Sequence, residues 1–335
     1  MSERCGQNPV FMGAVEGTYG TAVLVIECKS GCKLNYNEII PPLAIPRNTG
    51  QLVTQKMEVG VDTSYVDATM EGVLTVSILN YLLELLTGDA EPGASADVWT
   101  YVNLCARPGA TLFRYTDTGN IVTPETTKYD HVTGALLTQL VINFQPGSPV
   151  TFTASFKGKS LDRETTNTGD DALTLTAITD AAHPYDDVAV FGDVTVRLGG
   201  AGEAEITKFN GGTLTLTNEL ADDATLFQNS NTMVNPVVVR TGGTLAATWQ
   251  YDTDKDPTIN ANIRGTMQSD TITLLFGTVH QYAFVTYGQI DSYENPEVDR
   301  GKMLGSMVKN IMGDNTDSKV ALTVTYTDLT PEPEG

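Results

Sequence analysis

The residues that could carry acid–base or metal chemistry are few and stand apart in the sequence. The three histidines are His131, His183 and His280, and none has the spacing of a metal-binding helix. The sequence also lacks a serine nucleophile elbow, a phosphate loop and a dinucleotide-binding glycine pattern. Because catalysis needs a nucleophile or base beside a group that activates it, we expect no catalytic residues and no cofactor.

One acidic stretch has a spacing that could bind calcium. Asp252, Asp254 and Asp256 alternate, and alternate carboxylates can converge on a hard cation that prefers oxygen ligands. However, Pro257 stands where a calcium loop needs glycine, and Ile263 stands where it needs a bidentate glutamate. We therefore favour a solvated turn in which Asp256 caps a helix that continues through Met267.

The cysteines leave a zinc site as a second open possibility. Cys28 and Cys32 form one close pair, whereas Cys5 and Cys105 are isolated. A structural zinc site normally draws its thiolates from two such pairs. We favour free thiols packed as small core residues, and we expect no metal.

A hairpin is the clearest structural signal, and it spans residues 134–161. Two runs of high strand propensity flank the turn-forming sequence Gln145-Pro146-Gly147-Ser148-Pro149. Since successive strand side chains point to opposite faces, one face is apolar and the other polar, with Val141 as the exception. The expected core side chains are Leu140, Ile142, Phe144, Phe152 and Phe156. The expected water-facing side chains are Gln139, Asn143, Gln145, Thr151, Thr153, Ser155 and Lys157.

The three phenylalanines of this hairpin could instead stack on nucleic-acid bases. No basic residues interleave with them to hold phosphates, so we favour the core.

A similar pattern returns about 170 residues later, from Met303 to Leu329. We expect a second hairpin there, with its turn at Gly313 to Ser318. Its apolar side chains would be Leu322, Val324 and Tyr326, and its polar ones Thr323, Thr325 and Thr327.

The order of segments predicts a mainly β protein with two similar domains, residues 1–165 and 166–335. In the first, a strand near residues 72–76 leads to a short apolar helix, which Ser77 would cap and Gly88 would end. In the second, a strand at 243–251 leads to the helix that begins at Asp256. The proline-rich stretch at 41–46 is expected to form an exposed arm or loop, because proline donates no ladder hydrogen bond.

The charge balance excludes ordinary nucleic-acid binding. The chain has 41 acidic and 20 basic residues, a net charge of -21, and no cluster of Lys and Arg that would hold phosphates. No apolar run is long enough to span a membrane, and the first residues lack the pattern of a secretory signal. We therefore expect no membrane partner and synthesis in the cytoplasm.

Several short motifs, in this order, resemble one protein family. Residues 16–23 read EGTYGTAV, residues 79–89 read LNYLLELLTGD, and residues 156–159 read FKGK. Two further segments, VFGDVTVRLGG and ITKFNGGTLTLTNEL, lie within residues 190–220. Together they are similar to the major tail tube proteins of long-tailed bacteriophages over residues 11–329, although the arm at 41–46 departs from that pattern.

This resemblance implies two tandem β-sandwich or barrel-like domains, each with a short flanking helix and a long hairpin that lines a lumen. It implies a structural virion protein whose rings stack into the conduit for DNA ejection. Other copies of the chain, the tape measure protein and the tube terminator would be its partners. DNA would pass through without specific binding, and assembly would occur in the host cytoplasm.

The sequence is compatible with two numbers of chains per ring. If each half is one tube domain, three chains close a pseudo-sixfold ring, with the hairpins at 134–161 and 303–329 alternating around the channel. If the second half is only an elaboration of a single domain, six chains close the ring. The lumen would be neutral or negative, with Lys157 and Lys309 as exceptions.

A protein of another class, an immunoglobulin-like β-sandwich that binds a partner or decorates a virion, would also show repeated strands and an acidic surface.

Overall fold

The fold is mainly β. The computed structural model describes residues 10–16, 25–27, 33–39, 42–44, 59–61, 65–88, 98–101, 107–115, 128–166, 188–198, 205–206, 208–221, 233, 237–250, 267–299, 302–313 and 320–329. Within them lie one α-helix, one short 3₁₀ helix, a sixteen-stranded antiparallel sheet and a separate two-stranded ribbon.

The elements up to residue 166 are eleven strands and the helix. They are β1 (Val10–Val15), β2 (Val25–Glu27), β3 (Lys33–Ile39), β4 (Pro42–Ala44), β5 (Val59–Val61), β6 (Tyr65–Val73), α1 (Val76–Thr87), β7 (Val98–Tyr101), β8 (Ala110–Tyr115), β9 (Lys128–Phe144), β10 (Thr151–Gly158) and β11 (Ser160–Thr166).

The elements beyond it are a short 3₁₀ helix and seven strands. They are η3 (Phe191–Asp193), β12 (Val194–Arg197), β13 (Phe209–Leu220), β14 (Val238–Gln250), β15 (Gln268–Phe276), β16 (His280–Asp299), β17 (Lys302–Ile311) and β18 (Leu322–Asp328).

Eight neighbouring strands form the central part of the sheet, in the order β3-β6-β10-β9-β13-β14-β17-β16. We call this set the eight-stranded run. Its first four strands come from before residue 166 and its last four from after it. Strands β9 and β13 join the two groups by antiparallel pairing, from Gly212 with Phe144 to Thr217 with Gln139. The sheet is therefore continuous across the expected domain boundary.

The two groups of four strands have the same connectivity. The order β3-β6-β10-β9 matches β13-β14-β17-β16 position by position. The long strands match as well: the N-terminal part of β9 leaves the run to pair with β8 and β11, and that of β16 leaves it to pair with β15 and β18. In this correspondence β10 matches β17, and β11 matches β18.

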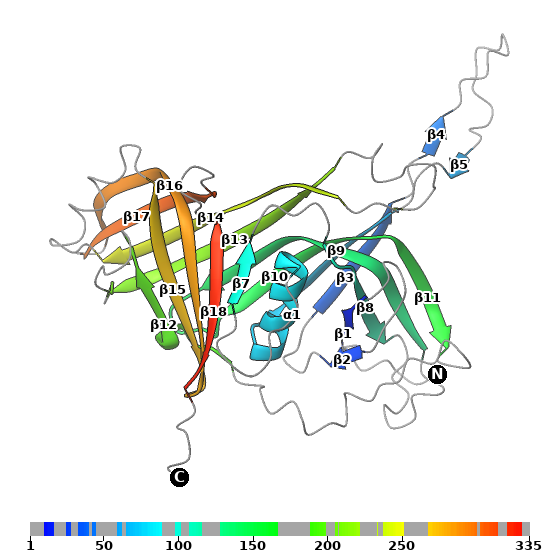
Figure 1. The fold of residues 1–335 in the computed structure, drawn as a ribbon, viewed down its shortest axis with the longest axis horizontal. Helices are drawn as coiled ribbons and strands as arrows, with labels where there is room; N and C mark the ends of the chain where they lie inside the picture. Colours follow the sequence, from blue (N-terminus) through cyan, green and yellow to red (C-terminus); the bar gives the residue numbers. More distant parts are fainter. Residues whose placement is uncertain are drawn as a thin grey trace, which may run out of the picture.

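The core lies against one face of the run, and α1 is buried within it. The helix contacts β1, β7 and β9. Figure 1 shows it between β7 and β1. It is apolar on nearly every side, which is typical of a helix covered all round. Its buried residues are Val76, Ile78, Leu79, Tyr81, Leu82, Leu83, Leu85, Leu86 and Thr87.

The ends of α1 differ in how well the sequence predicts them. Gly88 ends the helix as expected, because its left-handed backbone (φ 81°) lets its N–H donate to the Glu84 carbonyl at 2.8 Å. The expected cap at Ser77 is wrong. Thr75 is the N-cap residue, without a side-chain capping bond, and Ser77 lies inside the helix.

The hairpin at 134–161 is confirmed as β9 and β10, paired from Thr151 with Asn143 to Lys157 with Leu136. A β-bulge interrupts the pairing. Ser155 is opposite Gln139 but Phe156 is opposite Leu137, so Thr138 is the extra residue.

The second expected hairpin, from Met303 to Leu329, is wrong. Strand β17 pairs with β14 and β16, whereas β18 pairs with β16 and β7, so the two strands are not neighbours. Alternation is shared by any strand with one buried face, and for that reason β18 resembled β10 in sequence while occupying the place of β11.

Two further expectations concern the arm and the second helix. Pro42–Ala44 pairs with Val59–Val61 as a ribbon apart from the main sheet (Figure 1). The helix expected from Asp256 lies outside the described residues, except for Met267 at its end.

Candidate functional site

One face of the eight-stranded run is polar over its whole width, and we call it the polar face. A single row of cross-strand partners crosses all eight strands, because each partner in turn is opposite the next. The row is Lys33, Glu71, Thr153, Val141, Thr215, Thr244, Asn310 and Gln289. Seven of these eight side chains are polar, and Val141 is the exception.

The adjacent rows on this face are also mainly polar, although one of them includes Val73, Ala246 and Val308. On one side of the first row lie Asn35, Thr69, Ser155, Gln139 and Thr217. On the other side lie Val73, Thr151, Asn143, Thr213, Ala246, Val308 and Ser292. Hydroxyl and amide groups therefore dominate the surface.

The hairpin residues lie on the two faces as follows. On the polar face, Gln139, Asn143, Thr151, Thr153 and Ser155 are partly exposed, and Gln145 is exposed in the turn. On the opposite face, the buried side chains are Leu140, Ile142, Phe144, Phe152 and Phe156. Lys157 is partly exposed near the end of β10, with its ammonium 4.2 Å from the centre of the Tyr65 ring.

Hydroxyl groups of this surface are bonded to the sheet that carries them. Thr217 Oγ1 donates to the Gly242 carbonyl at 3.2 Å, and Thr248 Oγ1 donates to the Gly211 carbonyl at 3.0 Å. Thr213 Oγ1 donates to Asn143 Oδ1 at 3.2 Å. These three hydroxyls therefore use their single donor hydrogen within the sheet.

Along these rows, charged groups lie toward the margins of the polar face, although Lys157 on β10, Glu219 on β13 and Arg240 on β14 are charged farther along the central strands. At one margin Lys33 and Glu71 form an exposed ion pair at 3.6 Å. At the other, the exposed Glu294 accepts a hydrogen bond from the Ser306 hydroxyl at 2.9 Å. Among the described residues of the three rows, the strands between these margins carry no charge.

The expectation that Lys309 faces the lumen is wrong. This lysine lies in a buried row with Leu245 and Ile290, and its side chain has no exposed area. Its ammonium donates to Asp270 Oδ2 at 2.8 Å and to the Thr286 carbonyl at 2.9 Å. Burial lowers the pKa of Lys309, and the charge of Asp270 opposes that shift.

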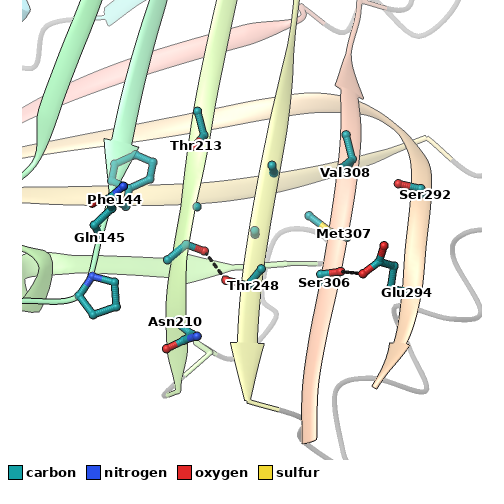
Figure 2. A pocket seen from close by; sticks show the side chains of 15 residues that line it. Phe144, Gln145, Asn210, Thr213, Thr248, Ser292, Glu294, Ser306, Met307 and Val308 are labelled. Carbon is teal, nitrogen blue, oxygen red and sulfur yellow. Dashed lines mark hydrogen bonds between the residues drawn. The ribbon is translucent and has the colours of Figure 1, made fainter. Parts of the chain in front are cut away.

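A hollow of about 400 Å³ opens at one end of the polar face, beside the β9–β10 turn. Figure 2 shows Thr213, Thr248, Ser306 and Val308 on adjacent strands along it, with Glu294 at its far margin. Two glycines in β13 line the hollow, and neither position has room for a side chain. A Cβ at Gly211 would lie 2.8 Å from the Phe144 carbonyl oxygen, and one at Gly212 would lie 2.4 Å from that of Ala246.

The threonines expected in the second hairpin lie elsewhere. Thr323 and Thr325 are partly exposed and Thr327 is exposed, all on β18, which is outside the eight-stranded run. Leu322 and Val324 are buried, and the hydroxyl of the half-buried Tyr326 lies 2.8 Å from Nδ1 of His280.

The metal candidates are either dispersed or outside the described residues. His131 pairs with Asp162 at 3.3 Å, and His280 contacts Tyr326. No group of three potential metal-binding side chains occurs in the part of the chain that the structure describes. His183, the four cysteines and the acidic stretch at 252–256 lie outside that part. None of its helices is long and apolar enough to cross a membrane.

Comparison with known proteins assigns the chain to a family. The family described as phage tail tube protein matches residues 10–327, which is nearly the whole chain. The chain belongs to the phage tail tube protein family. Comparison with curated proteins gives no match. The chain is thus a structural subunit of a phage tail tube and a component of the virion tail, and the family match favours this function over an immunoglobulin-like binding module.

A buried carboxylate in this tail tube chain was not singled out from the sequence, although it opens the EGTYGTAV motif. Glu16 Oε1 accepts hydrogen bonds from the Thr111 hydroxyl at 2.7 Å and from the Gly134 N–H at 2.9 Å. Gly134 lies in β9 where its pairing passes from β8 to β10. Glu16 therefore ties the first strand to the point where β9 changes partners.

A second buried polar contact joins the two halves of the tail tube chain. The Tyr101 hydroxyl lies 3.0 Å from Asn218 Oδ1 and also donates to the Thr217 carbonyl. The Asn218 amide in turn donates to the Leu137 carbonyl at 3.1 Å. These bonds connect β7, β13 and β9, and sequence reasoning missed them because the partners are far apart along the chain.

Proposed function

We propose that copies of this chain close into rings, that the rings stack into the tail tube, and that the polar face lines the channel for DNA ejection. The carrying observation is the row of partners from Lys33 to Gln289, which spans eight strands. A wall that separates a protein core from a water-filled channel needs one apolar and one polar face, as this run has. The threonines of β18 lie outside the wall.

Three chains per ring are supported by the matching connectivity of the two groups of strands. In this proposal, residues 1–165 and 166–335 are two tandem tube domains. The antiparallel pairing of β9 with β13 joins them within one chain, as subunits of a sixfold ring would be joined. Two such units in each chain give a trimer with pseudo-sixfold symmetry. The hairpin at 134–161 then neighbours the β13–β14 pair, rather than residues 303–329 as the sequence suggested.

The chemistry of the polar face supports passage of DNA without retention. Phosphate binding depends on clustered Lys and Arg, whereas the central strands of the described rows carry hydroxyl and amide groups. The net charge of -21 opposes DNA binding as well. On this account the chain has no enzymatic activity and needs no cofactor. Its partners are other copies, the tape measure protein and the tube terminator, and assembly takes place in the host cytoplasm.

Negative-stain microscopy of the purified protein under assembly conditions tests this function. Rings or tubes with a central hole, and class averages with threefold symmetry, are the expected result. Persistent monomers that bind a host protein or glycan would contradict the assembly. Rings of six chains would reject the tandem-domain part alone.

A further inference from the structure

We propose that β3 of one copy pairs antiparallel with the segment Gln289–Asp299 of β16 in the next copy, reproducing the β9–β13 junction. This inference rests on the proposed ring.

The two segments are the edges of the eight-stranded run. In the described chain, β3 pairs with β6 alone, and β16 beyond Gly288 pairs with β17 alone. Side chains at both edges are exposed, including Lys33, Asn35 and Asn37 on β3 and Gln289 and Ser292 on β16. A long strand edge with unpaired backbone groups is a template for pairing with another chain.

The internal junction shows how such edges fit together. Strand β9 ends the first group of four strands, and β13 begins the second. Strand β16 ends the second group as β9 ends the first, and β3 begins the first group as β13 begins the second. The pairing of β16 with β3 of a neighbour is therefore the β9–β13 pairing repeated between chains. Because β9 and β13 pair antiparallel, β16 and β3 should do so as well.

The bulges set the register of this pairing. In β9 the extra residue is Thr138, and in β16 the first extra residue is Asp291, because Ile290 is opposite Lys309 while Ser292 is opposite Val308. A second register shift in β16 comes only after Glu294, so it does not affect the alignment up to that residue. Three residues after each bulge come Val141 and Glu294. When the bulges are aligned, these two residues occupy equivalent positions.

The same correspondence carries across the group to β3. Val141 faces Thr153, Glu71 and Lys33 in succession, and Glu294 faces Ser306, Thr248 and Gly211. Lys33 is thus equivalent to Gly211, and Asn37, four residues later, to Thr215.

The partner of Val141 across the internal junction is Thr215. The partner of Glu294 across the junction between copies is then Asn37. Both side chains are exposed on the polar face, and the Asn37 amide can donate to the Glu294 carboxylate.

Cysteine pairing tests the register in full-length protein assembled into tubes. Directly opposed residues have Cβ atoms about 4.5–5.5 Å apart, close enough for a disulfide after a small adjustment. We expect the Asn37→Cys/Glu294→Cys variant to form dimers and a covalent trimer on non-reducing gels. Each single variant controls for Cys5, Cys28, Cys32 and Cys105, and Asn37→Cys/Gln289→Cys is the control with a displaced register.

A charge swap gives a second readout that needs no disulfide. Asn37→Asp should place two carboxylates face to face and reduce tube yield several-fold, and Asn37→Asp/Glu294→Lys should restore it. Wild-type tubes with no cross-linking of the 37/294 pair and no charge rescue would overturn the inference while leaving the tube function intact. Failure of the wild-type protein to form rings would count against the proposed function itself.

Discussion

Lys309 Nζ lies 2.8 Å from Asp270 Oδ2, and neither side chain has any exposed area. The lysine comes from β17 and the aspartate from β15, with Thr286 of β16 supplying two more oxygens. A buried pair of this kind needs both members, because one charge alone would remain in the core without compensation.

Removal of one partner should therefore cost more than removal of both. We expect Asp270→Ala to lower the free energy of unfolding by about 3–5 kcal/mol. The double variant Asp270→Leu/Lys309→Met should recover most of that loss, since it leaves apolar groups of similar size. Urea denaturation of the three proteins measures this. A double variant no more stable than the single one would contradict the argument.

Because of the Tyr101 hydroxyl, the stability of the folded chain should decrease at alkaline pH. Burial raises the pKa of Tyr101 above its ordinary value of about 10. The unfolded chain loses this proton near pH 10 while the folded chain keeps it. The stability that the protonated hydroxyl gives the folded chain is therefore fully present below pH 10 and is lost as the pH rises.

Tyr101→Phe should reduce that alkaline loss. At neutral pH the variant should be about 1 kcal/mol less stable, because the hydrogen bonds to Asn218 and Thr217 are gone. Between pH 9 and 11 its denaturation midpoint should fall less steeply than that of the wild type. The opposing effect of Lys309 is common to both proteins and cancels in the difference. Parallel curves would show that Tyr101 is not responsible.

Two adjacent glycines of β14 provide a matched test of packing in the eight-stranded run. A Cβ at Gly243 would lie 2.1 Å from the Thr215 carbonyl oxygen, whereas one at Gly242 would meet its nearest neighbour, the Ile311 carbonyl oxygen, at 3.6 Å. Gly243→Ala should destabilise the protein by about 1–3 kcal/mol, and Gly242→Ala should change it by less than about 0.5 kcal/mol. Thermal unfolding of both variants checks this; equal effects would mean that the close approach is relieved at little cost.

The neutral wall can be tested by adding positive charge to it. Thr153→Lys/Thr215→Lys places two lysines on the central strands, which should make assembled tubes retain double-stranded oligonucleotides in a salt-dependent way. Thr327→Lys, on β18, adds a charge outside the proposed wall and should leave retention unchanged. Co-sedimentation at low and moderate salt gives the readout. Equal retention by the two sets of tubes would argue that the polar face is not the channel.

Local patterns predicted the β9–β10 hairpin and the helix end at Gly88, because turn residues and alternation act over a few positions. The pairing of β9 with β13 depends on groups about 70 residues apart, and nothing in either strand specifies it. The burial of Lys309 was missed for a similar reason. Its partner, Asp270, is 39 residues away along the chain and lies on a strand that does not pair with β17. The similarity of β18 to β10 led to the wrong expectation of a second hairpin. Alternation indicates only that one face of a strand is buried, and does not indicate where in the sheet the strand lies.

Reconstruction of the assembled tube by electron cryomicroscopy, at a resolution that shows side chains, would reveal both the number of chains in a ring and the face of the sheet that lines the channel. We expect three chains per ring, with eight strands from each chain in the wall and the row from Lys33 to Gln289 facing the lumen. A ring in which the polar face points outward, or in which one group of four strands lies away from the channel, would contradict this expectation.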